Sequence, residues 1–382
     1  MISCHGRPRS ITFIAAFAAA LACSFSGIQA AQDGYSLPET GEELYAHACA
    51  ACHGASGAGA PASQLGFDVP MPDFTDCNFA TREADSDWVY VSVEGGPARG
   101  FSRLMPAFGD VLSRPQIKEI LAHIRTFCSN GDWARGELNL PRPLVTTKAY
   151  PEDELVLSTE VTVEGPNRIF NELIYEQRIG ARSQVELIFP FGWSEQKNAD
   201  DGSTEWSSSV GDMGLGFKHV LYHGLDTGSI LSLGAEIFLP TGDEDQGFGS
   251  GTTVLEPYLA YGQILPGGFF AQFQAGIALP YDNDNVGEEI FWRGMLGRMF
   301  NLGRYGRRLC PMVEILGSEA LVSGADTNWE AVPQVQITLN RRQHVRLAAG
   351  AQIPLNNTDG RKTAYIAYLL WDWFDGGLFE GW

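Results

Sequence analysis

The chain has 382 residues, a formal net charge of −20 at pH 7 and 44% hydrophobic residues. This length leaves room for two domains, and the acidic balance excludes nucleic acid as a partner. No window beyond the N-terminal region reaches about 18 apolar residues, which excludes a membrane-spanning helix. A membrane β-barrel is not excluded, because its hydropathy signal is weak in each strand.

The N-terminus has the pattern of a secretory signal peptide. Two arginines precede the apolar run from Ile11 to Ala22, and small residues at Ile28-Gln29-Ala30 provide a cleavage site. The apolar run is too short to span a bilayer, so we expect residues 1–31 to be removed on export. A lipoprotein anchored through Cys23 is the alternative.

The chemistry-bearing motif is Cys49-Ala50-Ala51-Cys52-His53. Two cysteines one helical turn apart with a histidine directly after the second are typical of c-type haem attachment. Each thiol adds to one vinyl group of the porphyrin, and the imidazole of His53 ligates the iron. A redox Cys-x-x-Cys pair or half of a zinc site is the alternative, and the adjacent histidine together with export favours haem.

The rest of the first domain, residues 32–132, is predicted to be helical. We expect a helix before the motif over 42–51, a short helix over 85–93, and a terminal helix over 113–127 with Ser113 as its N-cap. Cys77 and Cys128 are disulfide candidates because the exported compartment permits pairing, and two buried thiols are the alternative.

Two methionines compete for the open side of the iron. Met105 precedes a proline in the loop before the terminal helix, and Met71 lies between two prolines in an earlier loop. The position of Met105 relative to the helix and the haem motif favours it as the axial ligand.

These residues together resemble a class I cytochrome c domain, over almost the whole of residues 32–132. The resemblance implies a small all-α fold, one covalent haem c, and His53 and Met105 as the axial ligands. It also implies that a proline carbonyl, of which Pro61 is the nearest match, accepts the imidazole N–H of His53. With both axial positions filled, electron transfer is favoured over a haem enzyme, and the chain is expected to be an electron carrier.

Residues 133–153 are predicted to be a stiff, extended connector between the two domains. Pro141, Pro143 and Pro151 interrupt any regular element in this segment.

Residues 154–382 change to a period of two. Strands such as 229–239 and 269–279 alternate apolar and polar residues over about ten positions, as transmembrane β-strands do. About twelve such strands can be counted, joined by alternating short and long connections, which predicts an antiparallel outer-membrane β-barrel with its short turns in the periplasm. A soluble β-sandwich is the alternative.

Two stretches of this region, 211–218 and 239–242, resemble the outer-membrane channel family of phenol-degradation pathways. The whole chain is similar in architecture to cytochrome–porin fusions. The alternation assigns charged side chains to the lumen, namely Glu172, Glu176, Glu236, Glu256, Glu314, Arg178, Lys218 and Arg346.

The sequence therefore predicts a monohaem cytochrome anchored in the bacterial outer membrane, with the haem domain in the periplasm or at the barrel mouth. Its expected partners are periplasmic redox carriers, outer-membrane lipid, and a small-molecule or metal-ion substrate. The alternative is a solute channel in which the cytochrome acts as a plug or a redox gate.

Overall fold

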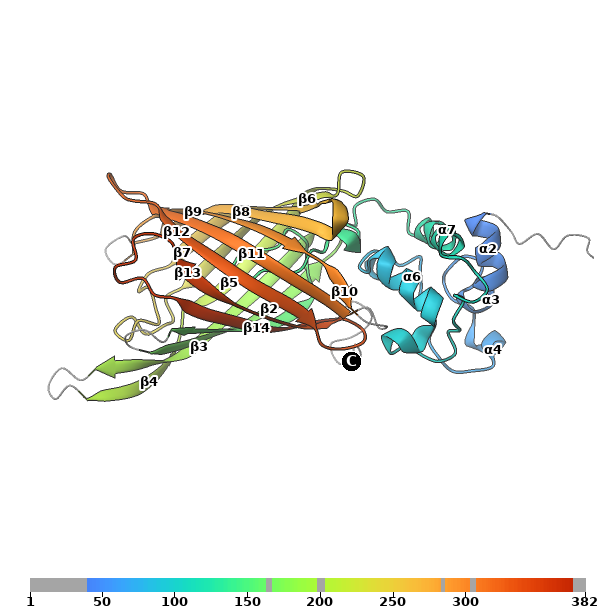
Figure 1. Cartoon of the computed structure of the whole chain (residues 1–382), viewed down its shortest axis with the longest axis horizontal. Helices are drawn as coiled ribbons and strands as arrows, with labels where there is room; N and C mark the ends of the chain where they lie inside the picture. The colour runs from blue at the N-terminus through green and yellow to red at the C-terminus, as the bar shows by residue number, and fades with distance from the viewer. Residues whose placement is uncertain (1–39, 163–166, 198–202, 283–285, 303–306, 374–382) are drawn as a thin grey trace, which may run out of the picture.

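The computed structural model describes residues 40–162, 167–197, 203–282, 286–302 and 307–373. The predicted signal peptide and Cys23 lie outside these residues. The described chain forms a helical domain followed by a long β-barrel, and the helical domain lies against one end of the barrel (Figure 1). None of the described helices is long and apolar enough to cross a membrane.

The helical domain has two well-capped helices that cross. Its elements are α2 (Gly41–Ala48), α3 (Ala50–His53), α4 (Ala62–Leu65), α5 (Cys77–Ala80), α6 (Asp85–Glu94), η1 (Gly96–Arg99) and α7 (Arg114–Arg125). Helix α7 begins with the predicted cap, because Ser113 and Gln116 form a reciprocal capping box. A Cβ atom on Gly41 would lie 2.1 Å from the carbonyl oxygen of Glu119, so only glycine allows α2 to approach α7 this closely.

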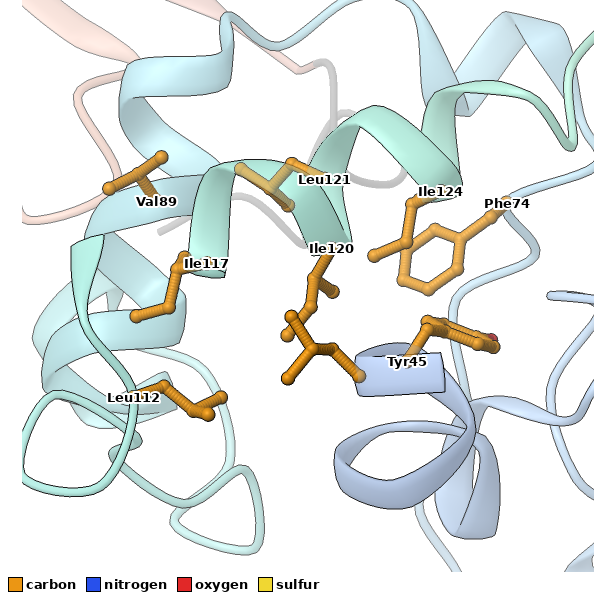
Figure 2. Close-up of a cluster of buried hydrophobic side chains, with 9 residues drawn as sticks. Tyr45, Phe74, Val89, Leu112, Ile117, Ile120, Leu121 and Ile124 are labelled. Carbon is orange, nitrogen blue, oxygen red and sulfur yellow. The ribbon is translucent and has the colours of Figure 1, made fainter. Parts of the chain in front are cut away.

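The core of this domain is built around α7. Ile120 and Ile124 on α7 point toward Tyr45 on α2 and the ring of Phe74 (Figure 2). Cys77 and Cys128 form a disulfide with their Cα atoms 5.2 Å apart, which joins α5 to the end of α7.

The barrel has fourteen strand segments that make twelve strands. They are β1 (Glu154–Thr162), β2 (Arg168–Ile179), β3 (Ser183–Lys197), β4 (Thr204–Val210), β5 (Met213–Gly224), β6 (Ser229–Leu239), β7 (Val254–Ile264), β8 (Phe269–Pro280), β9 (Glu289–Arg298), β10 (Phe300–Leu302), β11 (Arg307–Ala320), β12 (Asn328–Thr338), β13 (Val345–Pro354) and β14 (Ala364–Asp372). Segments β4 and β5 both pair with β3, and β9 and β10 both pair with β11, so each couple is one interrupted strand. The predicted count of about twelve is confirmed.

Pairing of β1 with β14 closes the barrel, and among the described strands only the short segments β4 and β10 are paired on a single side. The outer surface carries the apolar side of the predicted alternation, as at Leu157, Leu173 and Leu187, which are 38–50% exposed. Lumen-facing neighbours on the same strands, such as Val156 and Glu176, are buried. The pattern is that of a barrel whose apolar belt faces lipid.

The segment predicted as an extended connector lies inside the barrel. It contains η2 (Gly136–Leu138), and Leu138, Leu140, Ala149 and Tyr150 are all 1–2% exposed. Tyr150 packs with lumen-facing residues that include Val220, Ile230 and Phe291. The prolines prevent regular structure, as expected, but the segment fills the lumen at the end nearest the helical domain. We call residues 138–153 the plug.

Candidate haem site and barrel lumen

Cys49 is the N-cap of the short helix α3, which carries Cys52 and His53 within the turn that follows. The amide of His53 donates to the carbonyl of Cys49 at 2.9 Å. The Tyr45 hydroxyl donates to the carbonyl of Gly54 at 2.7 Å and so fixes the turn that follows the histidine. Burial, with the nearby Cys49 as a second cause, raises the pKa of Tyr45 to about 12, so the hydroxyl remains a donor at physiological pH.

The two thiols of the motif are free in the helix. Cys49 and Cys52 are half-buried and are not bonded to each other. Burial, followed by the charge of Cys52, raises the pKa of Cys49 to about 11. Redox-active Cys-x-x-Cys pairs show the opposite shift, because they need the thiolate at neutral pH. This environment argues against the thioredoxin-like alternative.

The imidazole of His53 is placed to act as a ligand. Its ring stacks on Phe74 with centroids 5.0 Å apart, and burial lowers its pKa, which favours the neutral form that binds metals. Its buried Nδ1 atom has no hydrogen-bond partner among the described residues. Two free thiols one turn apart and a neutral, incompletely satisfied histidine fit the attachment of haem c.

The loop that carries Pro61 lies beside the motif, because the amide of Ala60 donates to the carbonyl of Cys52 at 2.9 Å. The carbonyl of Pro61 accepts the amide of Gln64 at 2.8 Å, within the first turn of α4. The hydrogen bond from the imidazole to the carbonyl of Pro61 stays a prediction.

The two candidate methionines lie on different loops. A Cβ atom on Gly59 would be 2.9 Å from the Cβ of Met71, so Met71 packs against the loop that follows the haem motif. Phe74, three residues later, stacks on His53 itself. Met105 lies in the separate loop before α7, where its carbonyl accepts the amide of Gly96 at 3.1 Å. Met71 thus lies against the loop that follows the haem motif, on the histidine side of the domain, whereas Met105 lies on a separate loop.

Ion pairs join the helical domain to the barrel mouth. Asp87 on α6 pairs with Arg308 on β11, and Arg82 pairs with Asp153. Glu83 lies 3.3 Å from Nε2 of His344. Burial alone would raise the pKa of Asp87, but Arg308 and Arg99 outweigh it and hold that pKa below its ordinary value. Helix α6 faces the barrel, whereas α2, α3 and α4 lie on the far side of the domain (Figure 1).

Glu314 binds the backbone of the plug. Its carboxylate accepts hydrogen bonds from three successive amides, those of Leu144 (3.0 Å), Val145 (3.1 Å) and Thr146 (2.7 Å). Glu314 is completely buried. An ionised carboxylate is a strong hydrogen-bond acceptor. Because the plug is not paired with a strand, Glu314 satisfies backbone N–H groups of the plug that would otherwise be buried without a partner.

Charged groups complete the attachment of the plug. Arg142 pairs with Glu154 at 2.7 Å and with Glu176 at 3.0 Å. Lys148 pairs with Glu152, and its carbonyl accepts from Nζ of Lys218 at 2.9 Å. The predicted lumen charges Glu176, Lys218 and Glu314 therefore hold an internal segment, a role that the alternation alone did not reveal.

Asp212 organises the end of the barrel that lies away from the helical domain. Its carboxylate accepts the amide of Gly242 at 2.9 Å and that of Ser250 at 2.7 Å. These contacts bring together the two stretches, 211–218 and 239–242, on which the resemblance to the channel family depended.

The fold and the site define a haem c-type cytochrome domain joined to an outer-membrane, porin-like β-barrel. Residues 36–124 match the family model described as "Cytochrome C oxidase, cbb3-type, subunit III". Residues 142–303 match the model described as "Putative MetA-pathway of phenol degradation".

Several solved outer-membrane structures are similar to this chain. The COG4313 outer membrane channel from Pseudomonas putida F1 is 14% identical, with 61% of this chain and 100% of that chain covered and a TM-score of 0.43. The KdgM porin is 10% identical, with coverages of 58% and 99% and a TM-score of 0.38. The NanC porin is 10% identical, with coverages of 57% and 100% and a TM-score of 0.40. No curated protein matches the chain.

Proposed function

We propose that this protein is a monohaem c-type cytochrome that transfers single electrons at the outer membrane, where its barrel anchors it. The observation that carries the proposal is the placement of the motif. Helix α3 lies on the face of the helical domain turned away from the barrel, while the plug fills the lumen behind that domain (Figure 1). A redox centre in this position is open to soluble carriers.

The residues of the chain have distinct roles in this function. When bound, haem c supplies reversible one-electron chemistry. The thiols of Cys49 and Cys52 attach it, and His53 provides one axial ligand. Met105 is proposed as the other, because its loop does not belong to the histidine side. A redox centre with both axial positions occupied exchanges electrons without binding a substrate.

The haem domain is proposed to face the periplasm. It lies at the end of the barrel that carries the turn between β2 and β3, where Arg182 pairs with Asp132 at 2.8 Å. Short turns of this kind lie on the periplasmic side of outer-membrane barrels. The carriers that exchange electrons with it are then soluble periplasmic redox proteins.

Spectroscopy of the purified full-length protein tests the proposal. We expect a low-spin spectrum with a methionine-to-iron band in the ferric state, and rapid reduction or oxidation by a soluble c-type cytochrome. A high-spin spectrum that changes readily with cyanide would contradict electron transfer and favour a haem enzyme. A membrane-impermeant oxidant added to intact cells would oxidise the haem rapidly only if electrons also pass outward.

A solute channel is the second candidate. It is supported by the charged residues that line the lumen beyond the plug, such as Glu172 and Glu256, which are only partly buried. Conductance in a planar bilayer tests this function. Stable, solute-selective openings of the wild-type protein would favour the channel. If the plug stays inside the barrel permanently, we expect no conductance.

A further inference from the structure

A row of carboxylates runs around the inside of the barrel, from strand to neighbouring strand, along directly paired positions. Glu154 pairs with Glu176, and Glu176 pairs with Glu186. The row continues from Glu186 to Gly216 and from Gly216 to Glu236, and it ends at Glu256. Directly paired residues point to the same face of a sheet, so all of these side chains enter the lumen. Like charges in such positions repel each other, and a protein that keeps them needs compensating cations.

The plug compensates the first part of the row. Arg142 pairs with both Glu154 and Glu176, and Lys148 pairs with Glu152. The next two carboxylates, Glu186 and Glu236, have no hydrogen bond and no ion pair among the described residues.

Gly216 brings these two carboxylates together. A Cβ atom at Gly216 would lie 2.9 Å from the Cβ of Glu186, 3.6 Å from its carboxyl carbon, and 3.3 Å from the Cγ of Glu236. Both side chains therefore lie over the glycine, in the space that any other residue would fill. The glycine here has no positive φ to explain it, so its role is this close approach.

The carboxylate of Glu186 has no partner that would explain its position inside the barrel. The residue is only 8% exposed, yet its carboxylate has no hydrogen bond and no ion pair among the described residues, and a charge held in so little water is costly. The cations whose charge reaches it are Arg142 and Lys218, and both are engaged with other groups. Counted together, the cluster has four cationic groups and six carboxylates, which leaves two negative charges: Arg142, Lys148, Lys218 and Arg293 against Glu152, Glu154, Glu176, Glu186, Glu236 and Glu256.

We propose that Glu186 and Glu236 form a binding site for a partly hydrated divalent cation in the lumen, directly beyond the plug. Carboxylate oxygens are ligands that hard divalent cations prefer, and two carboxylates match the charge of one such ion. No group of three or more His, Cys, Asp or Glu residues is placed to hold a metal among the described residues, so water completes the coordination. The cation enters from the end away from the helical domain, because the plug fills the other end. This site does not depend on the electron-transfer function.

Binding of Mn²⁺ to the purified full-length protein tests the site. Electron paramagnetic resonance reports free Mn²⁺ during a titration, and Ca²⁺ or Mg²⁺ should displace the bound ion. We expect one Mn²⁺ per protein, with affinity weakened on the order of tenfold or more in the double variant Glu186→Gln/Glu236→Gln. Gly216→Ala should weaken binding as well, since it keeps both carboxylates but separates them.

The matched control is Glu330→Gln. Glu330 is another barrel carboxylate, but it is paired with Arg361 at 2.5 Å. Its replacement should leave Mn²⁺ binding unchanged. Equal weakening in the control and the double variant would show that the ion responds only to the general negative charge of the lumen and would overturn the site. Absence of Mn²⁺ binding by the wild type would overturn it too, and Gly216→Ala decides the question if the double variant does not fold.

Discussion

Single substitutions of Met105 and Met71 test which methionine is the axial ligand of the haem iron. Met105→Ala is expected to remove the methionine-to-iron band and to lower the reduction potential, because a thioether ligand raises it within the roughly 0.8 V range set by axial ligands. Met71→Ala is the matched control and should leave both unchanged. Absorption spectra and a redox titration measure the effect, and the reverse result would assign the ligand to Met71.

The disulfide between Cys77 and Cys128 closes a long loop of the helical domain, since the two cysteines are 51 residues apart. Closing a loop of this length restricts the unfolded chain by about 4 kcal/mol. Cys77→Ser/Cys128→Ser should therefore lower the denaturant midpoint of the helical domain by a corresponding amount. Circular dichroism at helical wavelengths follows this transition, and an unchanged midpoint would mean that the bond does not constrain the domain.

Residues whose chemistry is local could be predicted from the sequence, and residues whose role is long-range could not. Cys49, Cys52 and His53 act together because they lie on one helical turn, and that spacing is visible in the chain. The predicted role of Pro61 depends on the path of a loop, which spacing alone does not give, and it stays a prediction. Glu186 escaped notice because its meaning depends on Glu236 and on the glycine between them, which only strand register brings together.

At the level of elements, Glu314 is the principal attachment of the plug. Glu314→Ala removes the acceptor for three amides and leaves them unsatisfied inside the barrel, so we expect the plug to loosen. Planar-bilayer recordings should then show a larger ion conductance than that of the wild type. Glu319→Ala on the same strand is the control, because Glu319 contacts Thr327 rather than the plug. Equal conductance of both variants would contradict this role.

The strands and the plug differ in how far they could be predicted. The strands could be predicted from the alternation of apolar and polar residues, because every second side chain of a membrane strand faces lipid and is apolar. The plug has no such period, since each of its residues meets a different strand: Leu144 meets β11 and β12, whereas Ala149 meets Ser232 on β6. Proline and polar residues in this segment are compatible with a connector in solvent, and only the barrel supplies the partners that bury it.

At the level of the whole molecule, the docking of the helical domain on the barrel should depend on pH. The pKa of Asp87 is held below its ordinary value while it is buried against Arg308 and Arg99. Its contribution to docking is therefore fully present above about pH 4, the pKa of a free aspartate, and is lost as the pH falls through the lowered value. Cross-linking yield between the helical domain and the barrel, measured from pH 8 to pH 3, should stay level and then fall. A loss between pH 8 and pH 5 would contradict this assignment.

A charge exchange across the mouth tests the docking directly. Asp87→Arg places a third cation beside Arg308 and Arg99, which both pair with Asp87, and breaking a buried pair on one side costs about 3–5 kcal/mol. We expect this variant to release the helical domain, so that trypsin cleaves faster after Arg135, in the segment that joins the two domains. Arg308→Asp combined with Asp87→Arg should restore part of the protection, since the attraction between positions 87 and 308 is re-formed with opposite polarity while Arg99 still repels the new arginine. Asp110→Arg, at an exposed residue of the same domain, controls for the same change of net charge. If the double variant were cleaved as fast as Asp87→Arg alone, the ion pair would not be what holds the helical domain against the barrel.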